Sequence, residues 1–370
     1  MDITTCAFMG LGLIGGSIAK AIKKAKPNIR IKAFDINSQT LLLAKEEGII
    51  DEDYPLLKPD FFQCNILFLC APVSRNDENL KQIKEFLQKD CILTDVGSVK
   101  STIHETILEE GLEHCFIGGH PMAGSEKTGY EHSNPLLLEN AYYILTPTKR
   151  ISQERLDSYR ELVASFGAIP LILDYKEHDY ITAAVSHLPH IIASSLVNLV
   201  KDSDTETGLM KLIAAGGFKD ITRIASSSPV MWQQICLTNT ENIKLLLDDY
   251  IDSLNHIRNM LDTLPAAASK DSIYSLFDTA KNYRDSFPDA SSGPIKKVYD
   301  IHLEVPDEAG SIARTSVILA KHHISIKNIG IMHNREFLEG VLRIEFYDEA
   351  AQQSAIKLLQ EKDYKIYTAR

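Results

Sequence analysis

The sequence predicts three domains of different class: a doubly wound α/β domain, an all-α domain and a small βαββαβ domain. Short apolar runs alternate with amphipathic stretches over residues 1–174, as βαβ units require. Helical periodicity then dominates residues 175–285, and a segment rich in Ser, Pro and Gly (residues 286–297) separates it from residues 298–370. A chain of 370 residues has room for two or three domains.

The first domain is expected to be of Rossmann type, because buried parallel strands are continuous apolar runs joined by helices. Strands are predicted at residues 6–9, 29–34, 66–70, 92–96, 116–118, 142–145 and 169–173. Helices are predicted between them at residues 17–26, 38–47, 79–88 and 152–166.

The second and third domains differ in their periodicity. The long apolar helices of residues 175–285 need a partner surface, which predicts dimerisation. Residues 298–370 follow a ferredoxin-like βαββαβ pattern. Its strands are predicted at residues 299–305, 325–332, 340–346 and 364–367, and its helices at residues 311–322 and 349–360.

Composition argues against several classes of protein. A formal net charge of −11 argues against nucleic acid and anionic membrane partners. The start, MDITTCAFMG, has no cationic region, so we expect no leader sequence, and no stretch approaches the ~20 apolar residues of a membrane span. Six cysteines without a CxxC pair indicate reduced core residues in a cytoplasmic protein, and no residue pattern indicates a metal site.

A glycine-rich motif, GLGLIGGS, follows the first predicted strand and predicts a dinucleotide site. Gly10 permits a tight turn, Gly12 lets the backbone approach a pyrophosphate, and Gly15 lets helix and strand pack closely. Leu13 and Ile14 lie at the start of the helix, whose N-terminal N–H groups attract phosphates. The alternative is a glycine-rich turn without a ligand.

Asp35 ends the second predicted strand, 20 residues after Gly15. A carboxylate there accepts hydrogen bonds from both ribose hydroxyls and repels a 2′-phosphate, which favours NAD over NADP. A turn or N-cap aspartate is the alternative. Ala71 and Pro72, after the third predicted strand, would leave room for the cofactor, unless they form an ordinary strand-end turn.

Ser98 and His120 follow neighbouring predicted strands, so both are expected near the nicotinamide ring. A neutral imidazole can accept a proton from a substrate hydroxyl as the carbon loses hydride. The alternative for Ser98 is a cap of the following helix.

The segment SHLPH within a helical pattern contributes a second cluster. Pro189 frees the carbonyl of Val185 and can kink the helix. His187 and His190 are three residues apart and share a helical face, but a third strong metal ligand is missing. Polar packing around the kink and a substrate-binding wall both remain possible.

Two cations, Lys219 and Arg223, are four residues apart in GGFKDITR and are expected on one helical face. They suit a dianionic substrate, since arginine holds a carboxylate with two parallel hydrogen bonds. A solvated face paired with Asp220 is the alternative. Trp232 is the single tryptophan of the chain, and we expect it in a core or interface.

Together these motifs resemble the prephenate dehydrogenase family over residues 1–284. The shared elements, in order, are GLGLIGGS, TDVGSVK, GGHPMAGSEKTGY, LTPT, EHDY, SHLPH, GGFKDITRIA and MWQQI. The resemblance implies NAD-dependent oxidative decarboxylation of prephenate to 4-hydroxyphenylpyruvate. It makes His120 the catalytic histidine and Ser98 its assistant at the ring hydroxyl.

The resemblance also implies how the substrate is held. Arg223 corresponds to the arginine that binds the ring carboxylate, and Glu126 of GSEK matches a residue implicated in closing the pocket. The remaining positions implied to line that pocket are Lys219, Ser186, His187 and His190.

The tail resembles an ACT domain, a regulatory module that commonly binds amino acids, through the segment VPDEAGSI. The turn from Asp307 to Gly310 before a helix could offer backbone N–H groups to a carboxylate, and we expect tyrosine as a feedback inhibitor. ACT modules usually pair, so this site is expected between subunits. A dimerising or stabilising tail without an effector is the alternative.

Three other functions remain open. The first is the same chemistry on arogenate, whose side chain carries an ammonium group. The second is a β-hydroxyacid dehydrogenase, which relies on a lysine in its helical domain; only Lys219 is a candidate, and His120 would lack a role. The third is a non-enzymatic amino-acid sensor with a bound dinucleotide.

Overall fold

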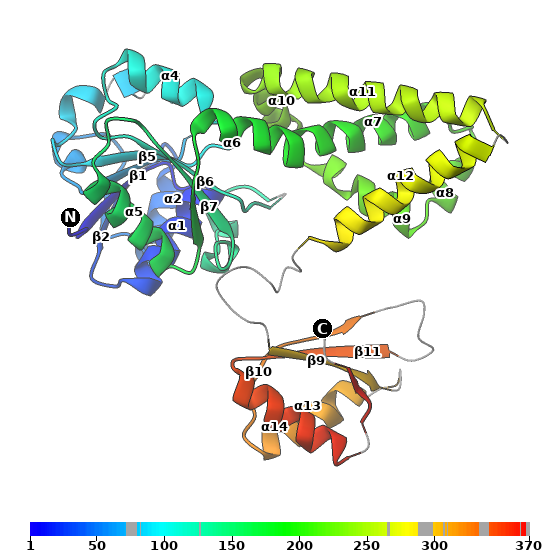
Figure 1. Ribbon diagram of the computed structural model, residues 1–370. Helices are drawn as coiled ribbons and strands as arrows, with labels where there is room; N and C mark the ends of the chain where they lie inside the picture. The colour runs from blue at the N-terminus through cyan, green and yellow to red at the C-terminus, as the bar shows by residue number, and fades with distance from the viewer. Residues whose placement is uncertain are drawn as a thin grey trace. The chain divides into compact units, whose positions relative to one another are not determined.

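The computed structural model describes residues 1–71, 80–81, 83–125, 127–264, 267–287, 299–305, 308, 310–332, 340–362 and 364–367. The chain forms two compact units, Met1–Ile273 and Tyr274–Arg370, with their boundary inside helix α12 (Ala267–Asp285) (Figure 1). Residues 288–297 of the predicted linker lie outside the described residues.

A five-stranded parallel sheet in the order β3-β2-β1-β4-β5 forms the centre of the first unit. Its strands are β1 (Thr5–Met9), β2 (Arg30–Phe34), β3 (Glu52–Tyr54), β4 (Ile66–Leu69) and β5 (Ile92–Asp95). The short strand β3 was not predicted, because its polar sequence EDY lacks an apolar run. The other four lie within one residue of the predicted bounds.

Side chains alternate between two hydrophobic cores on opposite faces of this sheet. Cys6 and Phe8 of β1 belong to one core, with apolar residues of α1 (Leu13–Ala25), α2 (Ser38–Glu46) and α5 (Gln153–Ser165). Ala7 and Met9 belong to the other, with residues of η1 (Pro59–Phe62) and α4 (Ser101–Glu109). Helices on both faces make this a doubly wound sheet, as predicted.

The last three strands depart from a purely parallel sheet. They are β6 (Ile117–Pro121), β7 (Tyr142–Pro147) and β8 (Ile169–Ile172), in the order β6-β7-β8. A parallel bridge between Leu93 and Phe116 joins them to β5. β6 pairs antiparallel with β7, because the described connection holds two short 3₁₀ turns, η4 (Tyr130–His132) and η5 (Pro135–Leu137), in place of a crossover helix.

Two predicted bounds were wrong in ways that matter for the site. Helix α1 begins at Leu13 and not at residue 17, because its first turn already includes the paired glycines, which lower helix propensity in the sequence pattern. Strand β6 extends to Pro121, so His120 lies within the strand and not after it. The segment predicted as a helix at residues 79–88 includes the short 3₁₀ helix η3 (Lys84–Phe86).

A 29-residue helix, Tyr175–Ser203, leads from the sheet into an all-α region. It consists of α6 (Tyr175–Thr182), a π-helical turn η6 (Ala183–His187) and α7 (Leu188–Ser203). By length and composition it could cross a membrane, contrary to our expectation from the sequence. However, α6 packs against α4 and β7, and α7 packs against α9, α11 and η7, as a helix within a folded domain does.

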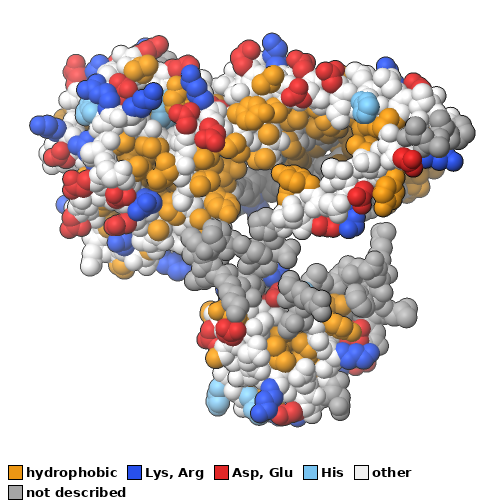
Figure 2. Space-filling model, in the orientation of Figure 1, with side chains coloured by type: hydrophobic (Ala, Val, Ile, Leu, Met, Phe, Trp, Pro, Cys, Tyr) orange, Lys and Arg blue, Asp and Glu red, His pale blue; other side chains and the backbone are white. Residues whose placement is uncertain are grey.

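The remaining helices of this region follow α7. They are α8 (Leu209–Ile213), α9 (Gly216–Thr222), η7 (Arg223–Ser226), α10 (Pro229–Thr238) and α11 (Thr240–Asp262). Many of their apolar side chains are exposed, and Figure 2 shows hydrophobic side chains gathered over the helical region. The exposed residues include Leu199, Leu212, Ile213, Leu237, Ile251 and Leu254.

The second unit contains a four-stranded, fully antiparallel sheet in the order β10-β11-β9-β12. Its elements are β9 (Tyr299–Val305), α13 (Ser311–Lys321), β10 (Ile326–Met332), β11 (Gly340–Phe346), α14 (Glu349–Gln360) and β12 (Ile366–Tyr367). The order of strands and helices is the predicted βαββαβ, and Ile301, Leu303 and Ile344 form its core with both helices.

Candidate active site

The glycine-rich turn between β1 and α1 (residues 10–15) forms a concave stretch of backbone, which we call the cradle. Gly10 adopts φ +99°, and a Cβ there would lie 3.0 Å from the carbonyl of Cys70. A Cβ on Gly15 would lie 2.5 Å from the carbonyl oxygen of Gly10. Nothing lies within 4 Å of the Cβ position of Gly12, so the space above this backbone is open. Gly10 and Gly15 are thus required by packing, and Gly12 leaves room for a ligand.

Helix α1 begins at this open space. Its N-cap is Gly12, no side chain caps it, and its first turn carries no acidic residue. The N–H groups of the first helical turn, which includes Leu13 and Ile14, have no intrahelical acceptors and carry partial positive charge. These residues therefore fit the pyrophosphate of a dinucleotide.

Asp35 lies directly after β2 and faces the same turn. Its carboxylate accepts hydrogen bonds from the backbone N–H groups of Leu11 and Asn37, both at 2.8 Å. A carboxylate has about four acceptor positions, so two remain for ribose hydroxyls. The N-cap of α2 is Asn37, which excludes the N-cap alternative for Asp35. Ala71 follows β4 and is partly buried, while Pro72 lies outside the described residues.

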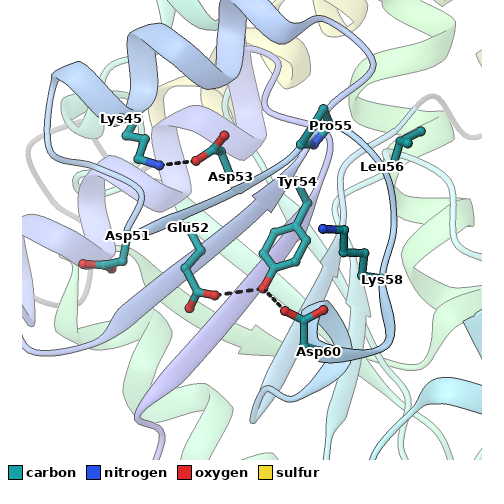
Figure 3. Close-up of a pocket in the computed structure, with 9 residues that line it drawn as sticks. All are labelled: Lys45, Asp51, Glu52, Asp53, Tyr54, Pro55, Leu56, Lys58 and Asp60. Atoms are coloured by element: carbon teal, nitrogen blue, oxygen red, sulfur yellow. Dashed lines mark hydrogen bonds and ion pairs between the residues drawn. The ribbon is translucent and has the colours of Figure 1, made fainter.

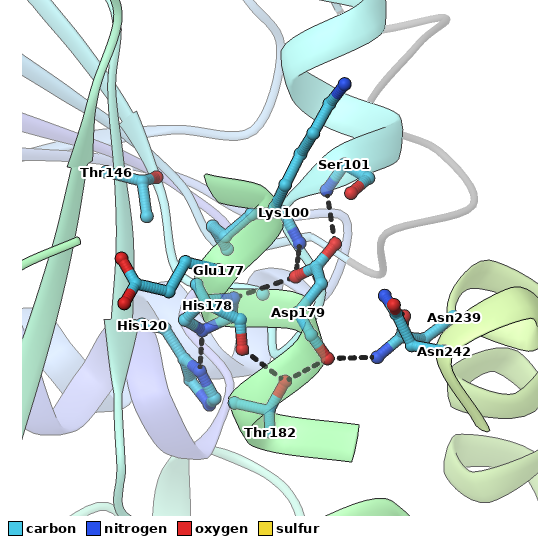
Figure 4. Close-up of polar contacts among 12 residues, drawn as sticks. Lys100, Ser101, His120, Thr146, Glu177, His178, Asp179, Thr182, Asn239 and Asn242 are labelled. Carbon is cyan, nitrogen blue, oxygen red and sulfur yellow. Dashed lines mark hydrogen bonds and ion pairs between the residues drawn. The ribbon is translucent and has the colours of Figure 1, made fainter. Parts of the chain in front are cut away.

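His120 is the first member of a buried chain of polar side chains (Figure 4). Its Nδ1 lies 2.7 Å from Nε2 of His178, and Nδ1 of His178 lies 2.7 Å from Oδ1 of Asp179. His178 and Asp179 are both 0% exposed and come from α6, whereas His120 comes from β6. Strand and helix thus meet at this chain.

Asp179 also fixes the start of α4. Its two carboxylate oxygens accept the backbone N–H groups of Lys100 at 2.8 Å and Ser101 at 2.7 Å. Burial raises the pKa of Asp179, but the hydrogen bonds from His178 and from these N–H groups outweigh burial and hold the pKa below its ordinary value. Asp179 is therefore ionised at neutral pH, and it accepts the N–H groups at the start of α4 that Ser98 was expected to cap as the alternative to its catalytic role.

Burial is the main cause that holds the pKa of His120 well below its ordinary value, and His178, Lys100 and His187 lower it further. The imidazole of His120 is therefore neutral at physiological pH, as a proton acceptor must be. Ser98 lies after β5, partly buried and two residues before the Lys100 N-cap of α4.

The π-helical turn η6 accommodates Pro189 within the long helix. The helix continues through the proline without ending, because the wider turn at Ala183–His187 absorbs the missing hydrogen bond. His190 Nδ1 lies 2.9 Å from the carbonyl oxygen of Ser186 and donates to it. The sequence predicted a freed carbonyl and a helix that can kink at SHLPH; the structure has a π turn there, which the sequence did not predict.

His187 and His190 share a face, as predicted, and both contact Trp232. The ring of His190 stacks on the indole at 3.6 Å between centroids, and the ring of His187 meets it edge-on at 6.0 Å. His187 is 1% exposed and lies 3.1 Å from the amide of Asn239, which favours polar packing for this residue. Among the described residues, the indole Nε1 of Trp232 has no hydrogen-bond acceptor.

Lys219 and Arg223 lie on two different helical elements, contrary to the single helix that we expected. Lys219 is in α9, which ends at Thr222, and Arg223 opens the 3₁₀ helix η7. Both side chains are exposed, and the charge of Arg223 lowers the pKa of His190, although burial contributes more. Arg223 is thus near the His190–Trp232 pair. Glu126 lies outside the described residues.

The tail places Gly310 at the N-cap of α13 in the left-handed region, φ +94°, ψ −4°. This conformation favours glycine and ends the turn that precedes the helix. Asp307 lies outside the described residues.

Sequence reasoning missed His178, Asp179 and Lys100 as site residues. The motif EHDY contains two of them, but no periodicity shows that residues 58 positions apart, such as His120 and His178, touch each other. The polar first turns of α6 (YKEHDYIT) do not reveal that His178 and Asp179 are buried, because the neighbouring Lys176 and Glu177 are exposed.

An open pocket of about 400 Å³ lies beside β3 and is lined by none of the predicted site residues (Figure 3). Its walls carry four carboxylates, Asp51, Glu52, Asp53 and Asp60. Lys45 pairs with Asp53, and the hydroxyl of Tyr54 contacts Glu52 at 2.8 Å and Asp60 at 2.9 Å. Carboxylates in this number repel phosphates, so the pocket does not suit a dinucleotide.

Comparison with known proteins adds to this geometry. The family model described as "Prephenate dehydrogenase, nucleotide-binding domain" matches residues 18–170, and "Prephenate dehydrogenase, dimerization domain" matches residues 174–278. The glycine-rich turn precedes the first matched range.

Two curated relatives are similar over nearly the whole chain. Prephenate dehydrogenase of Bacillus subtilis is 36% identical over 99% of this chain and 98% of its own length. That of Lactococcus lactis is 39% identical over 95% of this chain and 96% of its own.

Among solved structures, prephenate dehydrogenase from A. aeolicus in complex with hydroxyphenyl propionate and NAD+ matches with a TM-score of 0.70 and 32% identity. The match covers 77% of this chain and 98% of that one. With both family models and these relatives in agreement, the chain belongs to the prephenate dehydrogenase family.

Proposed function

We propose that this protein is an NAD-dependent prephenate dehydrogenase, which oxidises and decarboxylates prephenate to 4-hydroxyphenylpyruvate. The observation that carries the proposal is the neutral His120 imidazole on β6, in the same folded unit as an open glycine-rich cradle and Asp35. The relatives that carry this activity in their names match nearly the full chain.

The reaction needs one base, one hydride acceptor and groups that bind the two carboxylates of the substrate. Bound NAD would accept the hydride from C4 of the substrate ring. His120 takes the proton of the C4 hydroxyl, and Ser98 assists at the same oxygen. The dienone that results withdraws electrons as the C1 carboxylate leaves as CO₂, and the ring becomes aromatic, which makes the reaction irreversible.

The helical region supplies the groups that orient the substrate. Arg223 binds the ring carboxylate with a charge-assisted, two-pronged contact. The pocket is lined by Lys219, Ser186 and His190. His187 is 1% exposed, so it supports the pocket wall from below and does not present its ring to the substrate. Glu126 would close the pocket. Positioning of this kind aligns the substrate for hydride transfer.

The decisive experiment is NADH formation with prephenate and with arogenate, each with NAD and with NADP. We expect turnover of prephenate with NAD. A preference for arogenate would place the protein with the rival substrate, and no turnover of either would favour an amino-acid sensor. Asp35→Asn should narrow the preference for NAD over NADP, because the carboxylate no longer repels a 2′-phosphate.

A β-hydroxyacid dehydrogenase is the weaker alternative. Such an enzyme relies on a lysine in its helical domain, and the candidate, Lys219, is exposed. The buried chain from His120 to Asp179 has no role in that chemistry. Oxidation of a simple β-hydroxyacid with no turnover of prephenate would support it.

We further propose that residues 298–370 are a ferredoxin-like ACT domain that binds tyrosine as a feedback inhibitor. Support comes from the antiparallel order β10-β11-β9-β12 with two helices, and from Gly310 before α13, where backbone N–H groups can receive a carboxylate. Asp307 would belong to the same turn. Tyrosine should inhibit the full chain and should not inhibit a chain that lacks residues 298–370; undiminished inhibition would dismiss this role.

The same proposal includes a homodimer in the cytoplasm. Exposed apolar side chains on α7, α8, α10 and α11 need a partner surface, and the family model that matches this region is named for dimerisation. Paired ACT modules would place the amino-acid site between subunits. Sedimentation of the full chain tests the dimer directly.

A further inference from the structure

We infer that His178 is a positioning residue that fixes the tautomer of His120, and that Asp179 fixes the tautomer of His178 in turn; the inference rests on the proposed function. Figure 4 shows the three side chains in sequence, from β6 into α6. The catalytic base is thus the end of a buried relay, and both relay residues are 0% exposed.

The first step starts from Asp179. An ionised carboxylate only accepts hydrogen bonds, and this one already holds the N–H groups of Lys100 and Ser101. Its contact with Nδ1 of His178 at 2.7 Å therefore requires a proton on that nitrogen. An imidazole whose one proton sits on Nδ1 has a lone pair and no proton on Nε2.

The second step follows from the contact between the two rings. Nε2 of His178 lies 2.7 Å from Nδ1 of His120, so Nδ1 of His120 donates its proton to that lone pair. The neutral His120 imidazole then has its lone pair on Nε2. This is the only ring nitrogen of His120 left to accept a proton, and without His178 either nitrogen could carry the hydrogen.

The third step concerns the charge that forms during turnover. The O–H bond of the C4 hydroxyl breaks, a new N–H bond forms at Nε2 of His120, and the imidazole becomes a cation. The proton on Nδ1 remains shared with His178, whose own proton points to the carboxylate of Asp179. The negative charge of Asp179 is therefore coupled to the new positive charge through one ring.

The other charged groups around His120 do not supply this stabilisation. Lys100 from the start of α4 is a buried cation that binds the carbonyl of Gly119 at 2.8 Å, and it neutralises Asp95 at the end of β5. His187 from η6 lowers the pKa of His120 and therefore does not stabilise a positive charge on it. Of these described groups, Asp179 is the anion that remains to balance an imidazolium.

Two matched variants separate the roles of the two nitrogens of His178. In His178→Gln, the side-chain oxygen can occupy the place of Nε2 and accept from His120, while the link to Asp179 is lost. In His178→Asn, the shorter amide can still donate to Asp179, but nothing accepts from His120. We expect kcat for prephenate to fall at least ~10-fold in His178→Asn and to recover at least partly in His178→Gln.

Binding and pH dependence distinguish positioning from a structural defect. The dissociation constant for NAD and the KM for prephenate should change less than about threefold in both variants, because His178 is 0% exposed. The acidic limb of the kcat/KM profile should move to lower pH in His178→Asn, since an imidazolium at His120 loses its acceptor. Equal kcat in the two variants, or a loss confined to KM, would overturn the inference.

A second measurement needs no variant. The ¹⁵N chemical shifts of His120 in the wild-type full chain report which ring nitrogen carries the proton, and the inference expects Nδ1–H. A proton on Nε2 at neutral pH would overturn it, whether or not the variants fold. Wild-type NADH formation from prephenate is assayed alongside, so that failure of the proposed function is seen separately.

Discussion

The buried ammonium of Lys100 pairs with the carboxylate of Asp95, and the two side chains are 0% and 1% exposed. Lys100 also donates to the carbonyl oxygen of Gly119, the residue before His120. This contact joins the end of β5 to the strand that carries the proposed base. The ion pair therefore links the stability of the sheet edge to the position of the catalytic histidine.

Removing the cation should destabilise the protein strongly. Lys100→Met leaves Asp95 buried without its partner, and breaking a buried pair in this way costs about 3–5 kcal/mol. Lys45→Met is the matched control, because its pair with Asp53 lies at the surface and contributes about 0–1 kcal/mol. Urea unfolding of both variants checks this; equal losses of unfolding free energy would show that burial of the pair does not matter.

Two glycines of the cradle should fail in different ways when changed to alanine. Gly10→Ala forces φ +99° on a residue with a Cβ that meets backbone at 3.0 Å, so we expect a loss of about 1–3 kcal/mol in stability. Gly12→Ala places its methyl in open space, so its Tm should stay near that of the wild type while NAD binding weakens ~10-fold or more. Calorimetry and NAD titration measure the two effects, and normal NAD affinity in Gly12→Ala would exclude the cradle.

Acid should destabilise the protein through buried histidines. Burial lowers the pKa of His104 and of His187 to about 4, below the ~6.5 of an exposed imidazole. Between these values the unfolded chain binds more protons than the folded protein, so the free energy of unfolding falls as pH is lowered from about 6.5 to 4.

The variant His104→Gln tests this pH dependence. Glutamine can keep the hydrogen bond to Thr146 but does not titrate. The slope of unfolding free energy against pH should therefore decrease by about one proton, or ~1.4 kcal/mol per pH unit. Urea unfolding at pH 6.5, 5.5 and 4.5 measures the slope, and a slope equal to that of the wild type would refute the assignment.

Arg223→Ala should act mainly on substrate binding. Loss of a charge-assisted contact of about 1.5–3 kcal/mol corresponds to a ~10–100-fold rise in KM for prephenate, with a smaller change in kcat. Arg258→Ala removes another exposed cation of the helical region and serves as the control. An unchanged KM in Arg223→Ala would remove this residue from the carboxylate site.

Local patterns in the sequence predicted the elements of the fold well, since apolar runs and glycine spacing report burial and turns directly. The glycine-rich turn and the βαββαβ tail follow from such patterns, whereas the π turn before Pro189 was not predicted. The antiparallel β6–β7 pair does not, because periodicity carries no strand direction.

The candidate site was predicted only in part, for a physical reason. Asp35 directly follows β2, as the strand pattern predicted, whereas His120 was expected after its strand and lies inside β6. His178 and Asp179 act through contacts between distant segments, and such contacts depend on tertiary packing. For Arg223 the residue was predicted but its local structure was not. The helix that was expected to carry it with Lys219 ends at Thr222.

The central claim is that His120 is the base for prephenate oxidation, and His120→Asn tests it most directly. Asparagine fills similar space but cannot take a proton, so kcat for NADH formation from prephenate should fall ~10²–10⁴-fold while NAD still binds with wild-type affinity. A kcat near that of the wild type in this variant would contradict the claim.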